Sequence, residues 1–119
     1  MKSATAIAAL GALAHEHRLA IFRLLVEHGP DGLPAGVIAD TVGLVPSSLT
    51  FHLQDLTRSG LLKQRRQSRQ IFYAADFAAM NELVAYLTDH CCTASGACAP
   101  DCQPAIGEER RATKKRRRP

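Results

Sequence analysis

The chain has 119 residues, a hydrophobic fraction of 46% and a formal net charge of +4 at pH 7. This length allows one ordinary domain with a modest core, so burying further surface in a dimer would help to stabilise it. No apolar run approaches the length that crosses a bilayer, and we therefore expect no membrane partner and a cytoplasmic location.

The positive charge is unevenly placed along the chain. Residues 108–119 contain seven Lys or Arg, and five more lie within residues 58–69, a stretch without any Asp or Glu. Residues 1–107, which include the second stretch, contain eight basic and nine acidic residues and are close to neutral as a whole. One positive patch and one positive tail favour a polyanion as the partner.

The N-terminal part predicts helices. Residues 4–28 carry apolar side chains at helical spacing, Ile7 and Leu10 among them, which predicts one long helix or two helices joined near Gly11. Gly29–Pro30 ends this pattern. A shorter helix is expected over residues 34–42, with Val37, Ile38 and Ala39 facing inward.

Residues 44–60 have the pattern of a helix with two different faces. Leu49, Leu53 and Leu56 recur on one side, Pro46 suits the first helical turn, and Gly60 suits the helix end. The opposite face is polar and then basic, and consists of Ser47, Ser48, Thr50, Phe51, Gln54 and Arg58. A short helix, a turn and this second helix predict a helix-turn-helix whose second helix reads DNA.

After Gly60 the pattern alternates every second residue. Residues 62–66 and 69–73 predict two strands around a polar tip, and so a β-hairpin that forms a basic wing. We expect Ser47, Ser48, Thr50 and Gln54 to contact base edges. Contacts to phosphates or the minor groove are expected from Arg58, Lys63, Arg65, Arg66 and Arg69.

Asp76 predicts the N-cap of a last helix over residues 77–89. Its apolar positions exceed what a small winged core needs, and they are Phe77, Met80, Leu83, Val84 and Leu87. Pairing with the N-terminal helix, within one subunit or between two, would bury them.

Roughly residues 4–89 resemble the ArsR/SmtB family of bacterial metalloregulatory repressors. The resemblance rests on ALAHEHRLAIFRLL at 12–25, LPAGVIADTVGLVPSSLTFHLQDLTRSGLL at 33–62 and RRQSRQIFYAAD at 65–76. It implies a mainly α fold with a small β-hairpin, a winged helix-turn-helix that dimerises through its first and last helices. It also implies a homodimer on double-stranded operator DNA, released by metal or metalloid. The sequence shows no P-loop, no Ser/His/Asp order and no paired acids in a plausible pocket, so we expect no enzymatic activity.

We accordingly divide the chain into three parts. Residues 1–90 form the DNA-binding and dimerisation domain, residues 91–107 form a cysteine-rich metalloid-binding segment, and residues 108–119 form a basic disordered tail. No cysteine lies in residues 33–60, where many relatives carry a metal box, so a sensing site must lie elsewhere.

All four cysteines, Cys91, Cys92, Cys98 and Cys102, lie within twelve residues. Converging thiolates suit a soft ion, and three sulfurs satisfy As(III). The adjacent pair with a third cysteine six positions later is similar to the arsenite site of one branch of arsenic-responsive members. This resemblance implies As(III) ligation by Cys91, Cys92 and Cys98, with Cys102 as a further candidate ligand and Sb(III) as a competitor.

Other interpretations of the cysteines stay open. Zn(II) held by four thiolates is chemically reasonable, although adjacent cysteines fit the usual C-x₂-C bite poorly. Cd(II) or Pb(II) sensing would use the same sulfurs, and a redox switch, an arsenate reductase or a thiol protein that never meets DNA are further alternatives. We expect His15, His17, His28, His52 and His90 to be structural or surface residues. We also expect Asp89 and His90 to point to different sides of a helix.

Overall fold

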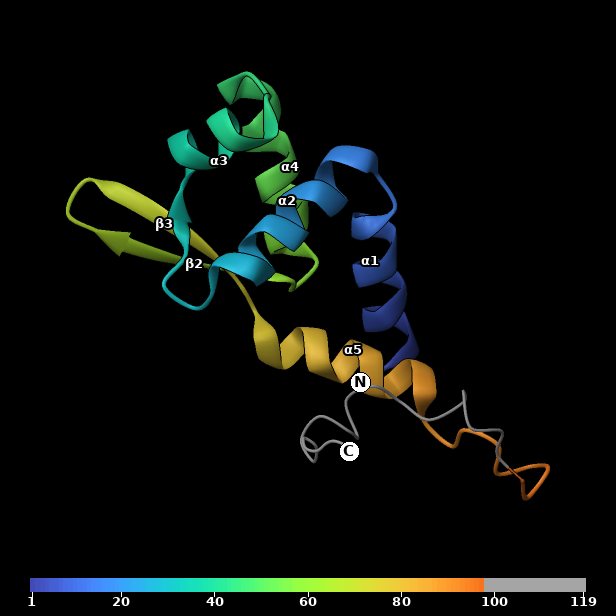
Figure 1. Cartoon of the computed structure of the whole chain (residues 1–119). Coiled ribbons are helices and arrows are strands. Elements are labelled where there is room, and N and C mark those ends of the chain that lie inside the picture. Colours follow the sequence, from blue (N-terminus) through green and yellow to red (C-terminus); the bar gives the residue numbers. More distant parts are fainter. Residues whose placement is uncertain (98–119) are drawn as a thin grey trace, which may run out of the picture. The chain divides into compact units, whose positions relative to one another are not determined.

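The computed structural model describes residues 1–97, in which five helices and three strands form (Figure 1). Their bounds are α1 Ser3–Leu13, α2 Glu16–His28, β1 Leu33–Pro34, α3 Ala35–Val42, α4 Pro46–Arg58, β2 Leu62–Gln67, β3 Gln70–Ala75 and α5 Phe77–Thr88. The chain divides into two compact units, residues 1–80 and the part from Asn81 onward. Cys98, Cys102 and the basic tail lie outside the described residues.

The N-terminal pattern forms two helices, and they are joined after Leu13 rather than near Gly11. The side chain of His15 caps α2 by accepting a hydrogen bond from the backbone N–H of His17, at 3.1 Å. A capping acceptor satisfies an N–H group that the first helical turn leaves without a partner. The capping residue, and not the glycine, therefore decides where the second helix begins.

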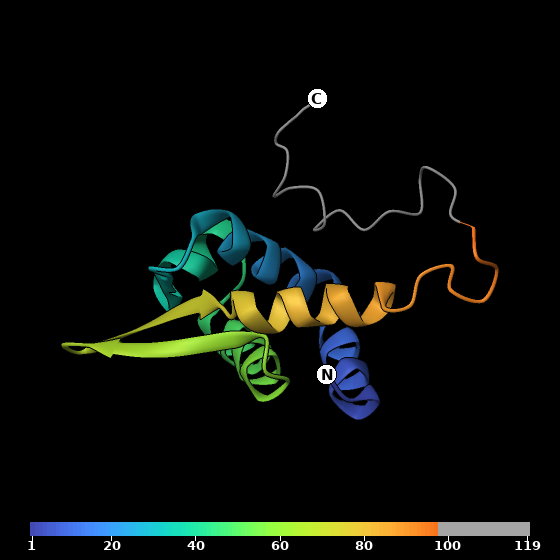
Figure 2. The ribbon, with the colours of Figure 1, turned by 90° about the horizontal axis from the view of Figure 1, so that it is seen from below.

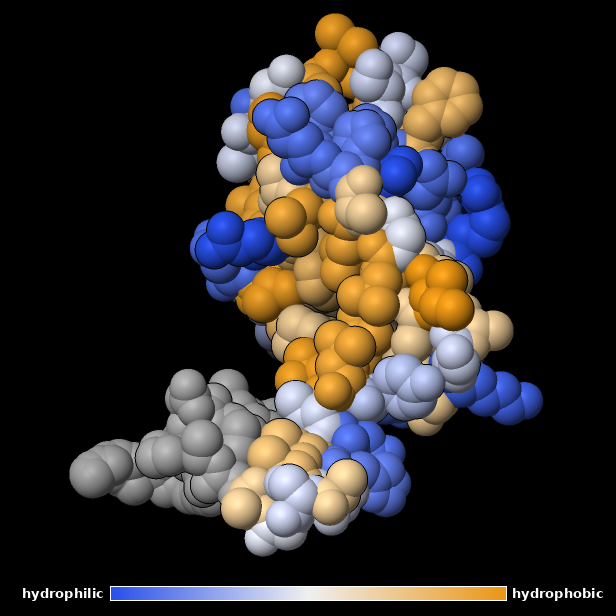
Figure 3. Space-filling view, turned by 90° about the vertical axis from the view of Figure 1, so that its right-hand side faces the viewer, coloured by the Kyte–Doolittle hydropathy of each residue, from blue (hydrophilic) through white to orange (hydrophobic). Residues whose placement is uncertain are grey.

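Small side chains make up the buried face of α1. Ala6, Ala9 and Ala12 are at most 9% exposed, whereas Ile7 is 66% and Leu10 41% exposed. Alanine lets a helix approach its neighbours closely, so the two larger side chains face outward. Figure 3 turns the side of the molecule that carries α1 toward the viewer, and hydrophobic side chains gather on that face.

One arginine connects the first three long helices of the N-terminal unit. Arg18 of α2 donates through Nε to the carbonyl of Ala12, at 2.7 Å, and through Nη1 to Asp55 Oδ2 of α4, at 2.8 Å. The core beneath these contacts consists of fully buried aliphatic side chains, namely Ile21, Leu25, Ile38, Leu49, Leu53, Leu56 and Leu61. Ile38 and Ala39 are buried as expected, but Val37 is 44% exposed, so its inward assignment was wrong.

The sheet has three antiparallel strands in the order β1-β3-β2. The hairpin of β2 and β3 was predicted, and it projects away from the helices of its unit (Figure 2). The short strand β1 was not predicted; it pairs Leu33 with Tyr73 and Pro34 with Phe72. The wing is therefore held at its base by the turn that precedes α3.

The last helix begins as its sequence predicts. Asp76 Oδ1 accepts a hydrogen bond from the N–H of Ala79 at 3.1 Å, which confirms the N-cap. Of the apolar side chains expected on its face, Leu83 is buried, while Val84 and Leu87 are 36% and 58% exposed. No helix within residues 1–97 combines the length and the apolar character that crossing a membrane requires.

Candidate nucleic-acid interface and cysteine segment

The turn between α3 and α4 depends on one glycine. Gly43 adopts a left-handed conformation, with φ 74° and ψ 35°, and both its N–H and that of Leu44 donate to the carbonyl of Ala39. A residue without Cβ adopts this conformation at no steric cost. The chain then enters α4 at Pro46, where a missing N–H is harmless. Gly43 and Pro46 therefore define where α3 ends and where α4 begins.

Helix α4 separates a buried face from an exposed one. Leu49, Leu53 and Leu56 are at most 2% exposed and anchor the helix to the core. The other side is exposed over Ser47, Thr50, Phe51, Gln54 and Arg58, while Ser48 is half-buried. The predicted exposed face thus exists, and it also includes Val45 at its start, 62% exposed, which the sequence pattern did not indicate.

Two of the polar side chains on this face already have partners within the protein. Thr50 Oγ1 donates to the carbonyl of Pro46 at 3.0 Å, and Arg58 Nη1 donates to Asp55 Oδ1 at 3.2 Å. The hydroxyl proton of Thr50 is therefore engaged in the helix. The side chain of Arg58, at the end of α4, remains 69% exposed.

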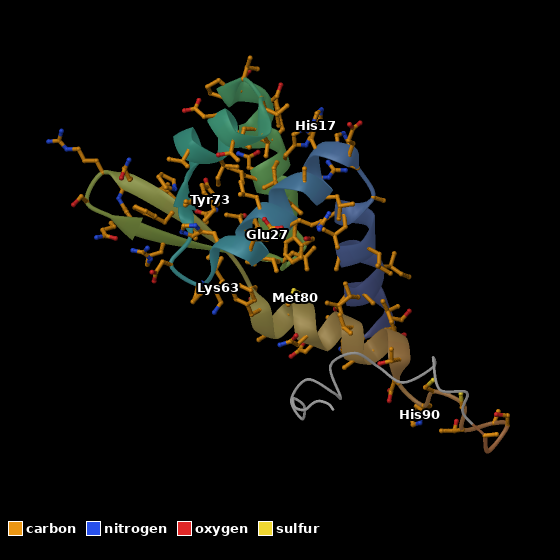
Figure 4. The ribbon with its side chains drawn as sticks, in the orientation of Figure 1. His17, Glu27, Lys63, Tyr73, Met80 and His90 are labelled. Atoms are coloured by element: carbon orange, nitrogen blue, oxygen red, sulfur yellow. The ribbon has the colours of Figure 1, made fainter. Side chains whose placement is uncertain are left out.

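The basic residues of the wing differ in their positions along the hairpin and in their contacts. Arg65 lies over the ring of Phe72, 4.7 Å from its centroid, and donates to the carbonyl of Asp31 at 2.7 Å. Lys63 lies at the base of the hairpin, where β2 begins (Figure 4). Arg66 and Arg69 are exposed beside the tip at Ser68. The tip arginines are thus the best placed to reach a phosphate, and Arg65 instead ties the wing to the turn before β1.

The cysteine segment begins three residues after α5 ends. Beyond Thr88 the backbone turns sharply, with positive φ at His90 and at Cys92, and the Sγ atoms of Cys91 and Cys92 lie 3.6 Å apart. Two thiolates bound 2.3 Å from one tetrahedral zinc would be about 3.8 Å apart, so the pair has the spacing of sulfurs that share a thiophilic ion. The hydrogen bond with Cys91 raises the pKa of the Cys92 thiol.

A third ligand for this pair is not among residues 1–97. Within that range no three His, Cys, Asp or Glu side chains are arranged to hold a metal ion. The predicted ligands Cys98 and Cys102 fall outside the described residues. Asp89 and His90 do not point apart as expected: Asp89 Oδ2 lies 3.6 Å from His90 Nε2, because the helix has already ended (Figure 4).

Known proteins match the helix-turn-helix and its surroundings. A family model described as a helix-turn-helix domain matches residues 13–65. The transcriptional activator HlyU of Vibrio cholerae is 34% identical over 85 residues, which cover 69% of this chain and 76% of that protein. The solved ArsR-like transcriptional regulator from Rhodococcus sp. RHA1 is 26% identical, with a TM-score of 0.63 over 71% of this chain and 76% of the other.

This chain belongs to the ArsR/SmtB family of transcriptional regulators. A further solved relative is the homodimeric winged helix-turn-helix domain of Mb0332 from Mycobacterium bovis, described as a possible ArsR-family regulator. It is 28% identical, with a TM-score of 0.57 over 73% of this chain and 81% of that one. The family and the winged helix-turn-helix fold agree with the predictions from sequence, and the relatives named here are transcriptional regulators.

This ArsR/SmtB chain also contains a cluster of histidines that its sequence did not reveal. The rings of His15, His17 and His52 lie with centroids 4.7–5.7 Å apart, and His52 belongs to α4. His52 Nδ1 is buried without a hydrogen-bond partner among the described residues. Burial, followed by the charges of His15, Arg18 and His17, lowers the pKa of His52, and Asp55 opposes the shift. No local pattern could have linked residues this far apart in the chain.

Proposed function

We propose that this ArsR/SmtB regulator is an arsenite-responsive repressor. A homodimer holds operator DNA and releases it when As(III) binds Cys91, Cys92 and Cys98; Sb(III), which shares this three-sulfur chemistry, acts in the same way. The observation that carries the proposal is the 3.6 Å separation of the Cys91 and Cys92 Sγ atoms directly after α5. These two sulfurs are already spaced to bind one soft ion, and Cys98 follows six residues after the second.

The binding reaction is a ligand exchange at arsenic. Each of three thiols forms one S–As bond, and its proton leaves with one hydroxyl of arsenous acid as water. Three waters are released, and neither sulfur nor arsenic changes oxidation state. The thiophilic preference of the ion favours three cysteines over the oxygen and nitrogen ligands available elsewhere in residues 1–97.

DNA binding in this proposal uses α4 and the wing. The dimer places its two α4 helices in successive major grooves, about 34–36 Å apart. Ser47, Ser48 and Gln54 contact base edges, while Arg66 and Arg69 contact phosphates or the minor groove. The homodimeric state of the Mycobacterium bovis relative supports this arrangement.

The exposed apolar residues of α1 and α5 support a dimer that uses the first and last helices. Ile7 of α1 and Leu87 of α5 are 66% and 58% exposed, which is costly for side chains of this size in water. The cysteine pair follows α5 directly, so an ion bound there acts on a helix of the proposed interface. Allosteric coupling of this kind typically amounts to about 1–3 kcal/mol per site.

The test is a fluorescence-anisotropy titration of a promoter duplex with arsenite, on the wild type and on Cys91→Ser, Cys92→Ser and Cys98→Ser. We expect the wild type to release DNA and each of the three variants to need far more arsenite. Cys102→Ser is the matched control and should respond as the wild type does. If all three variants release DNA at the wild-type arsenite level, the assigned ligands are wrong; if the wild type stays bound when saturated, the inducer is wrong.

Zinc is the second candidate inducer, because the Cys91–Cys92 spacing also suits two thiolates on tetrahedral Zn(II). The same titration with Zn(II) and Cd(II) separates the two proposals. Sulfur-to-metal charge-transfer absorbance on adding arsenite, together with DNA release, supports As(III). Release by Zn(II) alone would replace arsenite with zinc as the signal.

A further inference from the structure

The DNA-reading face of α4 carries an aromatic ring in water. Phe51 is 69% exposed, the largest exposed fraction among the large hydrophobic side chains of residues 1–97, and Val45 at the start of the helix is 62% exposed. Removing such a side chain from water is favourable in proportion to the apolar area that is covered. An exposed phenylalanine in the middle of this face therefore indicates that a partner covers it when the regulator binds.

The neighbours of Phe51 limit what that partner can be. Ser47 and Gln54 lie four residues before it and three after it, so all three share one exposed ridge of the helix. The Thr50 hydroxyl donates its hydrogen bond to the carbonyl of Pro46. The centre of the reading face thus offers an apolar surface with a polar side chain on either side, rather than a row of hydrogen-bond donors.

One base edge in the major groove matches an apolar surface. Thymine presents its C5-methyl group there, whereas guanine presents the N7 and O6 acceptors and cytosine presents its N4 amino donor. Covering such a polar group with a phenyl ring would leave it without a hydrogen-bond partner, which is unfavourable. A thymine methyl under the ring loses nothing and is removed from water.

We propose that Phe51 determines the operator specificity of this regulator by packing on a thymine C5-methyl group in each half-site, with Val45 as a second apolar contact at the helix start. Gln54, one turn along the same ridge, has the amide geometry that pairs with adenine. The preferred half-site therefore contains a thymine that the protein recognises through its methyl group. This inference rests on operator binding through α4, as in the proposed function, and is independent of the cysteine site.

The experiment removes only the methyl group. The full-length protein is used to select a duplex from random-sequence DNA at pH 7.5, and each thymine of that duplex is then replaced in turn by deoxyuridine. We expect replacement of the thymine under Phe51 in one half-site to weaken wild-type binding about fourfold, which corresponds to the transfer free energy of one methyl-sized group. Replacement in both half-sites should weaken binding about fifteenfold. Phe51→Ser should bind the thymine and uracil duplexes equally.

Gln54→Ala is the matched control, because it alters the same ridge and keeps the ring. It should retain the wild-type sensitivity to uracil at the position under Phe51. The inference is overturned if the wild type is indifferent to every uracil replacement, or if Phe51→Ser keeps the wild-type sensitivity.

The outcomes also separate this inference from the proposed function. If arsenite releases the protein from the selected duplex but uracil replacement does not change the affinity, only the role of Phe51 is overturned. A duplex sensitive to uracil that arsenite cannot release supports Phe51 and removes arsenite as the inducer. If the selection enriches no sequence, both are overturned.

Discussion

Replacing Gly32 by alanine tests the way in which the wing is attached. Gly32 has φ +79°, and a Cβ there would lie 2.6 Å from the carbonyl oxygen of Tyr73, in the strand that β1 pairs with. The left-handed conformation costs about 1–2 kcal/mol for a residue with a side chain. Displacing a backbone carbonyl adds about 1–3 kcal/mol, the usual cost of overpacking.

Together these terms predict that Gly32→Ala lowers the free energy of unfolding by about 2–5 kcal/mol. Each kcal/mol lowers the melting temperature by about 4–8 °C in a domain of this size. Urea unfolding followed by circular dichroism measures the change directly.

Gly43→Ala is the matched control for this measurement. Gly43 has nearly the same φ, +74°, but its Cβ would meet nothing within 4 Å. Only the backbone cost of about 1–2 kcal/mol should therefore appear. The reasoning is refuted if the two alanine variants lose equal stability, since contact with Tyr73 would then have no measurable cost.

Three further predictions concern the N-terminal unit. Arg18→Met removes the hydrogen bonds to the end of α1 and to Asp55 and should destabilise the fold by about 1–3 kcal/mol, whereas the exposed Arg58→Met should stay within about 0.5 kcal/mol in the same urea assay. Because burial lowers the pKa of His52, the unfolded chain binds a proton at a higher pH than the folded chain does. The contribution of His52 to stability should therefore be complete above pH 6.5 and decrease as the pH falls below it. In thermal melts taken from pH 8 to pH 5, His52→Gln should reduce this dependence on pH. Arg66→Ala should weaken binding to selected and random duplexes alike and reduce the salt slope by about one, and an unchanged slope would remove this residue from the phosphate contacts.

The sequence predicted those elements whose signals are local. Leucines at helical spacing, Pro46 at the entry and a glycine at the end predicted α4, and all three leucines are buried. Alternation around a polar tip predicted the hairpin, and Asp76 predicted the start of α5. Each of these signals acts within a few residues of the chain, so no knowledge of the fold was needed.

Burial followed the local pattern less well. Ile7, Leu10 and Val37 lie at helical spacing but are exposed, and alanines form the buried face of α1. Periodicity identifies a helix, but the shape of the neighbouring elements decides which side of it packs against the core. Only small side chains fit where two helices approach closely, so the buried face of a helix depends on its neighbouring elements as well as on its own sequence.

By itself the sequence determined the helix-turn-helix, the basic hairpin and the concentration of thiols after the last helix, because periodicity, turn residues and composition act over short distances. Only the tertiary structure decided that β1 pairs with β3, that Arg18 joins α1 to α4 through Asp55, and that His15 and His17 meet His52 of α4. The pairs Leu33–Tyr73, Arg18–Asp55 and His15–His52 are each separated by 37 to 40 positions in the chain. They form because packing of the leucine core brings the elements together, and no pattern within a single segment contains that information.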